Sequence, residues 1–186
     1  YWIDQDLSEN NNHELNFKKS KYLLKSIQKA QGESVFISAY LSHIFCVNKL
    51  REIFPNPIFI FLKRDELSNI YSLYKGHKKY NSWMSLKPKN INESNDHFEN
   101  AVNQYFRLEK VMSEHFDHND SFCLNYEDIC KNPHKSLELI SKELNKRGYQ
   151  IELNPIKFPD FKAKIYDEKE NTELEKLNDL RKKYKC

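Results

Sequence analysis

Short apolar runs alternate with longer amphipathic stretches along the chain. The runs 35–40 (VFISAY), 58–62 (IFIFL) and 121–126 (SFCLNY) are too short for helices and rich in aromatic or β-branched residues, so they predict strands. The run 58–62 shows no alternation of apolar and polar residues. That pattern favours a strand covered on both faces, as in parallel sheets.

Between these runs, apolar residues recur at helical spacing. The helices that this pattern predicts are 15–30, 42–53, 66–75, 96–116, 134–147 and 171–184. The segments 76–95 and 149–170 lack such a period and are predicted to be irregular. Strands that alternate with helices indicate an α/β fold with a mainly parallel sheet flanked by helices. A length of 186 residues suits a single domain over 1–186.

The composition narrows the classes of function. The 30 basic and 27 acidic residues are interspersed and leave a net charge of +3, so no basic stripe predicts nucleic-acid binding. No run approaches the ~20 apolar residues of a membrane-spanning helix. With 3 glycines, the chain holds no complete Walker A or GxGxxG loop, which disfavours a nucleotide kinase. None of the 4 cysteines forms a CxxC pair, which favours reduced thiols and a cytoplasmic location.

Candidate chemistry lies where the run 58–62 ends. Ligands bind at the carboxyl ends of strands in open parallel sheets, and Arg64 follows this run directly before a predicted helix. A helix N-terminus favours anions, and an arginine offers two parallel donors to a phosphate. Ser72 lies two turns into that helix and offers a hydroxyl. The alternative is that Arg64 pairs with Asp65 or Glu66 and that Ser72 is simply a small helix residue.

Two segments in this order resemble signatures of the sulfotransferases. Residues 53–76 (IFPNPIFIFLKRDELSNIYSLYKG) resemble the segment that binds a nucleotide 3′-phosphate, with the spacing from Arg64 to Ser72 kept and Glu66 in place of the usual proline. Residues 124–145 (LNYEDICKNPHKSLELISKELN) resemble the second signature, in which a strand leads into Y-E-D-[LIM] and then N/D-P. The resemblance spans about 34–146 and implies the P-loop-like α/β architecture of that family.

The resemblance implies an activity and a set of binding residues. The donor would be 3′-phosphoadenosine 5′-phosphosulfate (PAPS), and the product 3′-phosphoadenosine 5′-phosphate (PAP), with no metal. The acceptor would be a hydroxyl or amine of a small molecule or glycan. Arg64 and Ser72 would hold the 3′-phosphate, and Tyr126 would lie near the adenine. Glu127 and Asp128 are expected to orient the loop through hydrogen bonds rather than to take part in the chemistry.

One part of the family pattern is absent from the sequence. The family holds the 5′-phosphosulfate in a strand–loop–helix of the type PK[ST]G[ST][ST], and no such segment occurs here. The chain begins without methionine, so one interpretation places the loop upstream of Tyr1 and makes the domain N-terminally incomplete. The alternative is a catalytically inactive PAP-binding or interaction protein of the same fold. The sequence carries no signal for an oligomeric state.

His43 is the candidate for the general base. It follows the predicted strand 35–40, and a neutral imidazole suits proton removal near pH 7. In the cytosolic branch of the family, a catalytic histidine lies at about this distance before the phosphate-binding arginine, although the lysine of its K-T-H motif is missing here. Alternatively His43 simply opens a helix, and Glu33 is a second candidate base.

Two further groups are weak candidates for sites. Trp83, with its neighbours in the segment 76–95, could form a lid over the acceptor or could simply anchor a loop. His115, Asp117, His118 and Cys123 lack the second ligand pair of a metal site, so no metal is expected.

Overall fold

The structure is a computed structural model. The chain forms two compact units. The structure describes residues 19, 21–23, 25–26, 29, 37–39, 41–84, 94–115, 119–153, 157–159, 161–166 and 172–185. Unit 1 is Tyr1–Pro57 with Ser85–Lys87, and unit 2 is Ile58–Met84 with Pro88–Cys186. That 1–186 form a single functional domain stays a prediction.

Unit 1 is helical where it is described in full. A 3-10 helix, η1 (Leu41–Cys46), leads into α2 (Val47–Ile53), which confirms the helix predicted over 42–53. The described residues between 19 and 29 are also helical. The predicted strand 35–40 fails at its described residues 37–39, which have no regular structure and leave Ile37 86% exposed. An apolar run forms a strand only where a neighbouring strand and a packed face are available.

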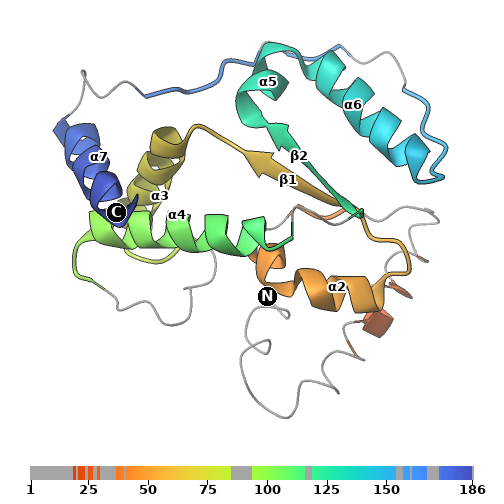
Figure 1. Cartoon of the computed structure of the whole chain (residues 1–186), viewed down its shortest axis with the longest axis horizontal. Helices are drawn as coiled ribbons and strands as arrows, with labels where there is room; N and C mark the ends of the chain where they lie inside the picture. The colour runs from red at the N-terminus through yellow and green to blue at the C-terminus, as the bar shows by residue number, and fades with distance from the viewer. Residues whose placement is uncertain are drawn as a thin grey trace. The chain divides into compact units, whose positions relative to one another are not determined.

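Unit 2 contains a parallel pair of strands, β1 (Phe59–Lys63) and β2 (Ser121–Asn125), as Figure 1 shows. The register pairs Phe59 with Ser121 and Lys63 with Asn125, so both strands end at the same edge. Parallel strands and flanking helices confirm the predicted α/β fold. The expectation that β1 is covered on both faces is wrong, because Phe61 is buried whereas Ile60 and Leu62 are 43% and 53% exposed. Alternate side chains point to opposite faces of a sheet, so β1 has one packed face and one open face.

Five helices are described in unit 2: α3 (Glu66–Tyr80), α4 (His97–Ser113), α5 (Tyr126–Lys131), α6 (Pro133–Lys146) and α7 (Thr172–Lys185). Helix α3 is longer than predicted because Gly76 does not end it. The Met84 side chain packs on Gly76, where a Cβ atom would lie 2.5 Å from Met84 Cγ. The helix ends at Asn81, which takes a left-handed conformation with φ of 46°. Helix α5 is too short to show a sequence period.

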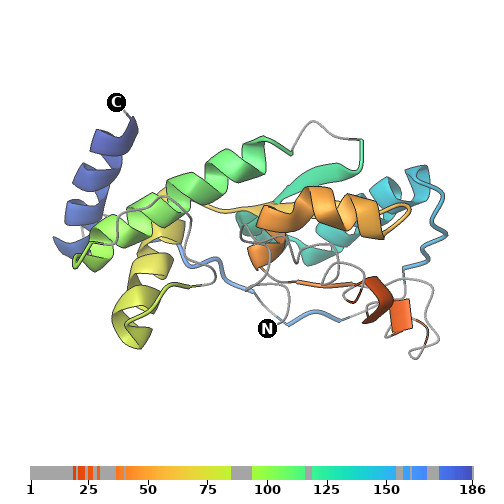
Figure 2. The ribbon, with the colours of Figure 1, turned by 90° about the horizontal axis from the view of Figure 1, so that it is seen from below.

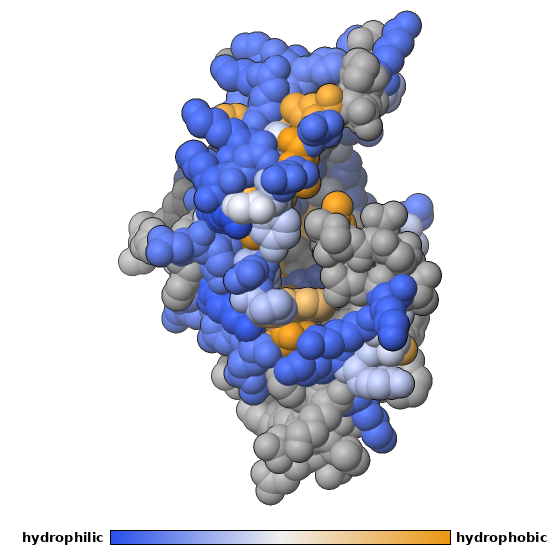
Figure 3. Space-filling view, turned by 90° about the vertical axis from the view of Figure 1, so that its right-hand side faces the viewer, coloured by the Kyte–Doolittle hydropathy of each residue, from blue (hydrophilic) through white to orange (hydrophobic). Residues whose placement is uncertain are grey.

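The main core of unit 2 lies between α3, α4 and α7, which Figures 1 and 2 show packed together. Ile70, Val102 and Leu177 are fully buried there. Leu174 of α7 is also buried, so the charged terminal helix docks through a leucine face. Within the part of the chain that is described, no helix is long and apolar enough to cross a bilayer. The face drawn in Figure 3 is largely hydrophilic, with small apolar patches.

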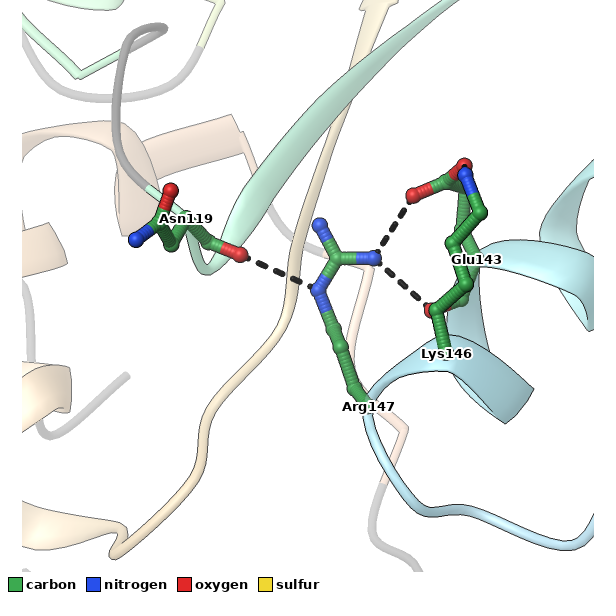
Figure 4. Close-up of polar contacts among 4 residues, drawn as sticks. All are labelled: Asn119, Glu143, Lys146 and Arg147. Carbon is green, nitrogen blue, oxygen red and sulfur yellow. Dashed lines mark hydrogen bonds and ion pairs between the residues drawn. The ribbon is translucent and has the colours of Figure 1, made fainter.

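A second packing site joins α6 to the start of β2 through Arg147 (Figure 4). Its Nε donates to the carbonyl oxygen of Asn119 at 3.1 Å, and Nη1 donates to the carbonyl oxygen of Glu143 at 2.8 Å. Nη1 also contacts the Glu143 carboxylate at 2.8 Å, and the Lys146 ammonium contacts the same carboxylate from a more exposed position. Arg147 therefore holds the end of α6 against the turn before β2.

Replacing Arg147 tests this link. We expect Arg147→Ala to lower the melting temperature by about 2–5 °C, because two carbonyl oxygens lose a donor. The control Lys146→Ala removes only the more exposed contact and is expected to change the melting temperature less. Thermal unfolding followed by circular dichroism measures both. Equal losses in the two variants would contradict the role given to Arg147.

His77 is a buried polar residue between α3 and α4. The residue is 2% exposed, and its Nε2 lies 2.7 Å from Gln104 Oε1. The Trp83 ring packs edge to face on the imidazole, with 4.9 Å between the ring centroids. Burial lowers the pKa of His77 below its ordinary value, and the positive charge of a protonated His97 acts in the same direction, while the hydrogen bond to Gln104 opposes both. The folded protein therefore keeps His77 neutral at pH values where the unfolded chain already binds a proton.

The lowered pKa of His77 predicts a loss of stability in acid. The contribution of the neutral side chain is complete above pH 6.5, the ordinary histidine pKa, and falls as the pH drops through that value. We expect the melting temperature of the wild-type protein to fall from pH 7.5 to pH 5.5 more steeply than that of His77→Gln. Parallel curves for the two proteins would rule out His77 as a source of this pH dependence.

Candidate functional site

The end of β1 passes directly into α3, as the sequence predicts. Asp65 is the N-cap of α3, and its Oδ1 accepts a hydrogen bond from the Ser68 N–H at 2.8 Å. Glu66 begins the helix and pairs with Arg181 of α7 at 3.1 Å. The carboxylates beside Arg64 are therefore directed to the helix backbone and to α7. The sequence alternative in which Arg64 pairs with Asp65 or Glu66 is not observed.

The end of β2 places the second signature beside the first. Because Lys63 pairs with Asn125, the residues that follow the two strands leave the sheet at the same edge. Glu127 Oε1 accepts a hydrogen bond from the Asp65 N–H at 3.0 Å, and Asp128 Oδ2 accepts one from Asn125 Nδ2 at 3.1 Å. Both carboxylates therefore hold the loops in place, which is the role expected of them.

Arg64 lies at the centre of this edge. Its guanidinium carbon is 4.9 Å from the centre of the Tyr126 ring, a cation–π contact between the two signatures. Its Nη2 donates to the carbonyl oxygen of Lys164 at 2.6 Å. Its Nε is buried and has no hydrogen-bond partner among the described residues. A buried donor without an acceptor raises the free energy of the folded protein, so an added acceptor at this guanidinium would be stabilising.

A second cation lies on the same side of α3. Lys75 Nζ donates to the Tyr166 hydroxyl and lies 4.3 Å from the centre of that ring. It is also 4.6 Å from the centre of the Tyr71 ring. The Tyr166 N–H donates to the Ser68 hydroxyl at 3.2 Å. Residues 164–166 thus contact Arg64, in the loop before α3, through the Lys164 carbonyl, and Ser68 and Lys75 of α3 through Tyr166.

The positive charges beside residues 161–166 act on Tyr166. The hydrogen bond from Lys75 lowers the pKa of the Tyr166 hydroxyl, although burial opposes it. The charges of Lys75, Lys164 and Arg64 act in the same direction as the hydrogen bond. The surroundings of this hydroxyl therefore favour negative charge on oxygen. Sequence reasoning missed these contacts because they join positions 91–100 residues apart.

The structure brings some of the predicted site residues together. Arg64 and Tyr126 are in direct contact, as described above. Ser72 lies on α3 one turn beyond the buried Ser68 and is exposed. His43 lies half-buried in η1 of unit 1. The roles of Ser72 as a phosphate ligand and of His43 as a base stay predictions, and Glu33 lies outside the described residues.

The weaker candidates have structural partners or lie partly outside the description. Trp83 packs on His77, and the Met84 carbonyl oxygen accepts from Gln104 Nε2 at 2.6 Å, so Trp83 and Met84 are anchored to α3 and α4. That arrangement favours the anchored loop over the acceptor lid. No three His, Cys, Asp or Glu side chains cluster for a metal in the described part of the chain, and Asp117 and His118 lie outside it.

Comparison with known proteins relates this edge of the sheet to one family. A family model for the sulfotransferases matches residues 2–146, a range that contains Arg64, Tyr126 and the elements from β1 to α6. Neither a curated protein nor a solved structure matches the chain.

Proposed function

Because the chain belongs to the sulfotransferase family, we propose that it transfers a sulfuryl group from PAPS to a hydroxyl or amine of a small molecule or glycan. The observation that carries the proposal is Arg64, a cation at the carboxyl end of a parallel strand with a buried, unpartnered Nε. No described carboxylate pairs with it. Such a guanidinium fits the 3′-phosphate of the nucleotide.

The neighbours of Arg64 supply the rest of the proposed nucleotide site. The N-terminus of α3 adds a positive dipole end, which favours a phosphate. Tyr126 holds the guanidinium by its ring and offers the adenine an aromatic neighbour. Ser72, on the exposed side of α3, is proposed as a further donor to the phosphate. These side chains bind and orient the nucleotide and take no part in proton transfer.

Sulfuryl transfer, like phosphoryl transfer, depends mainly on positioning and on stabilising charge. The bond between sulfur and the 5′-phosphate oxygen of the donor breaks, a bond from sulfur to the acceptor oxygen or nitrogen forms, and PAP leaves. A base then holds the acceptor proton, and His43 is proposed for this role.

A second candidate function is PAP binding without transfer. It is favoured by one observation, the absence of a PK[ST]G[ST][ST] motif from the printed sequence. The two functions differ in a single assay. A protein that binds PAP but moves no radiolabelled sulfate from PAPS to any acceptor in a mixed panel of glycans and phenols has the second function.

Arg64→Ala tests the phosphate site. We expect PAP affinity to fall by about 1.5–3 kcal/mol, the range for a hydrogen bond to a charged group. Arg64→Lys keeps the charge but loses the paired donors, so its affinity should lie between those of wild type and Arg64→Ala. Isothermal titration calorimetry measures all three, with Lys142→Ala on the exposed side of α6 as control. Wild-type affinity in Arg64→Ala would remove Arg64 from the site.

His43→Ala tests the base. Loss of a general base lowers turnover by about 10²–10⁴-fold, whereas PAP affinity should stay within about twofold of wild type. Turnover is measured by radiosulfate transfer and affinity by calorimetry. Unchanged turnover in His43→Ala would exclude His43 as the base, and an equal loss of affinity would assign it to nucleotide binding instead.

A further inference from the structure

Two cations beside α3 are both held by neutral oxygens of residues 161–166. Arg64 donates to a main-chain carbonyl, that of Lys164. Lys75 donates to the hydroxyl of Tyr166. In the described part of the chain neither cation pairs with a carboxylate, although the chain is rich in acidic residues. Cations held only by neutral acceptors are poorly matched to their partners and bind an anion more strongly.

The two cations lie along one face of α3. Ser68 and Lys75 are seven residues apart, which is two helical turns, so both side chains project from the same face. Residues 164–166 follow this face, with the Lys164 carbonyl at Arg64 and the Tyr166 N–H at Ser68. The Tyr166 ring then reaches Lys75 and meets Tyr71 edge to face at 4.7 Å.

The charge around Tyr166 supports the same interpretation. The hydrogen bond from Lys75 lowers the pKa of its hydroxyl, and the charges of Lys75, Lys164 and Arg64 act in the same direction, so each of these cations acts on this hydroxyl. The Asp65 and Glu127 carboxylates at this edge face the backbone, since Asp65 accepts from the Ser68 N–H and Glu127 from the Asp65 N–H. The Glu173 carboxylate, which accepts from the Tyr71 hydroxyl, pairs with Lys78. Because Arg64 contacts the Lys164 carbonyl and Lys75 contacts the Tyr166 hydroxyl, residues 164–166 bridge two cations, and the place that these oxygens occupy favours an anion.

We propose that Lys75 is a second cationic ligand of the nucleotide 3′-phosphate, and that the Lys164 carbonyl and Tyr166 hydroxyl occupy this site until the nucleotide displaces them. The proposal rests on the proposed function, because it assigns a further ligand to the same nucleotide. In the absence of the nucleotide, two neutral oxygens of residues 164 and 166 then take the positions of phosphate oxygens. It also makes Tyr166 a competitor of the ligand and not one of its contacts.

The test compares two nucleotides that differ only in the 3′-phosphate. Calorimetry of the full chain with PAP and with adenosine 5′-phosphate is carried out on wild type, Lys75→Ala, Lys75→Arg and Lys79→Ala. Loss of one cationic ligand should weaken PAP binding about tenfold in Lys75→Ala, with adenosine 5′-phosphate unaffected. Lys75→Arg should restore most of the affinity. Lys79, on the exposed side of the same helix, contacts the Tyr80 ring, and Lys79→Ala should bind both nucleotides as wild type does.

Tyr166→Phe tests the competition. Removing the hydroxyl frees Lys75 while the ring remains, so PAP should bind more tightly than to wild type, by up to about fivefold. Equal or weaker PAP binding in Tyr166→Phe would overturn the competing role. Melting curves for each variant establish that it is folded before its affinity is compared.

The outcomes separate this inference from the proposed function. Wild-type PAP affinity in Lys75→Ala, together with a loss in Arg64→Ala, overturns the role of Lys75 and leaves the nucleotide site standing. An equal loss of PAP and adenosine 5′-phosphate binding in Lys75→Ala also overturns it, because the 3′-phosphate is then not the partner. A wild-type protein that binds neither nucleotide overturns the proposed function itself.

Discussion

The parallel pairing of β1 with β2 sets the geometry on which the candidate site depends. The register that places Lys63 beside Asn125 brings the two strands out of the sheet together, and the chain then turns into α3 and α5 at the same edge. The Glu127 carboxylate receives the Asp65 N–H only because of this register. A shift by one residue would turn each side chain to the other face and separate Arg64 from Tyr126.

The helices around the sheet hold that edge in place, and the carboxylates beside Arg64 bond to these helices and not to Arg64. The Asp65 and Glu66 carboxylates, which stand next to Arg64 in sequence, are used to begin α3 and to join it to α7. The acidic side chains thus contribute to the fold and do not neutralise the arginine. The chain keeps a positive site although its basic and acidic residues nearly balance, because the folded backbone decides which charges meet.

Local patterns in the sequence predicted the parts of the fold that local interactions determine. The runs 58–62 and 121–126 predicted β1 and β2, and the spacing of apolar residues predicted most of α4 and α6. The extension of α3 beyond Gly76 depends on Met84, which packs over the glycine only in the folded chain. The sequence could not predict the exposure of Leu62 either, because that exposure depends on which elements cover the sheet. The order of the two signatures in the sequence was enough to identify Arg64 and Tyr126 as candidates. Lys75 and Tyr166 belong to no motif, and they come into contact only in the folded chain.

The contact between Arg64 and Lys164 also has a kinetic consequence. It closes a loop of 100 residues, and the entropy lost in closing a chain segment grows with its length. Contacts of such long range are expected to form after the strands and helices they join, so the cationic face of α3 should be completed among the last steps of folding. During synthesis, these two residues can meet only after Lys164 has left the ribosome.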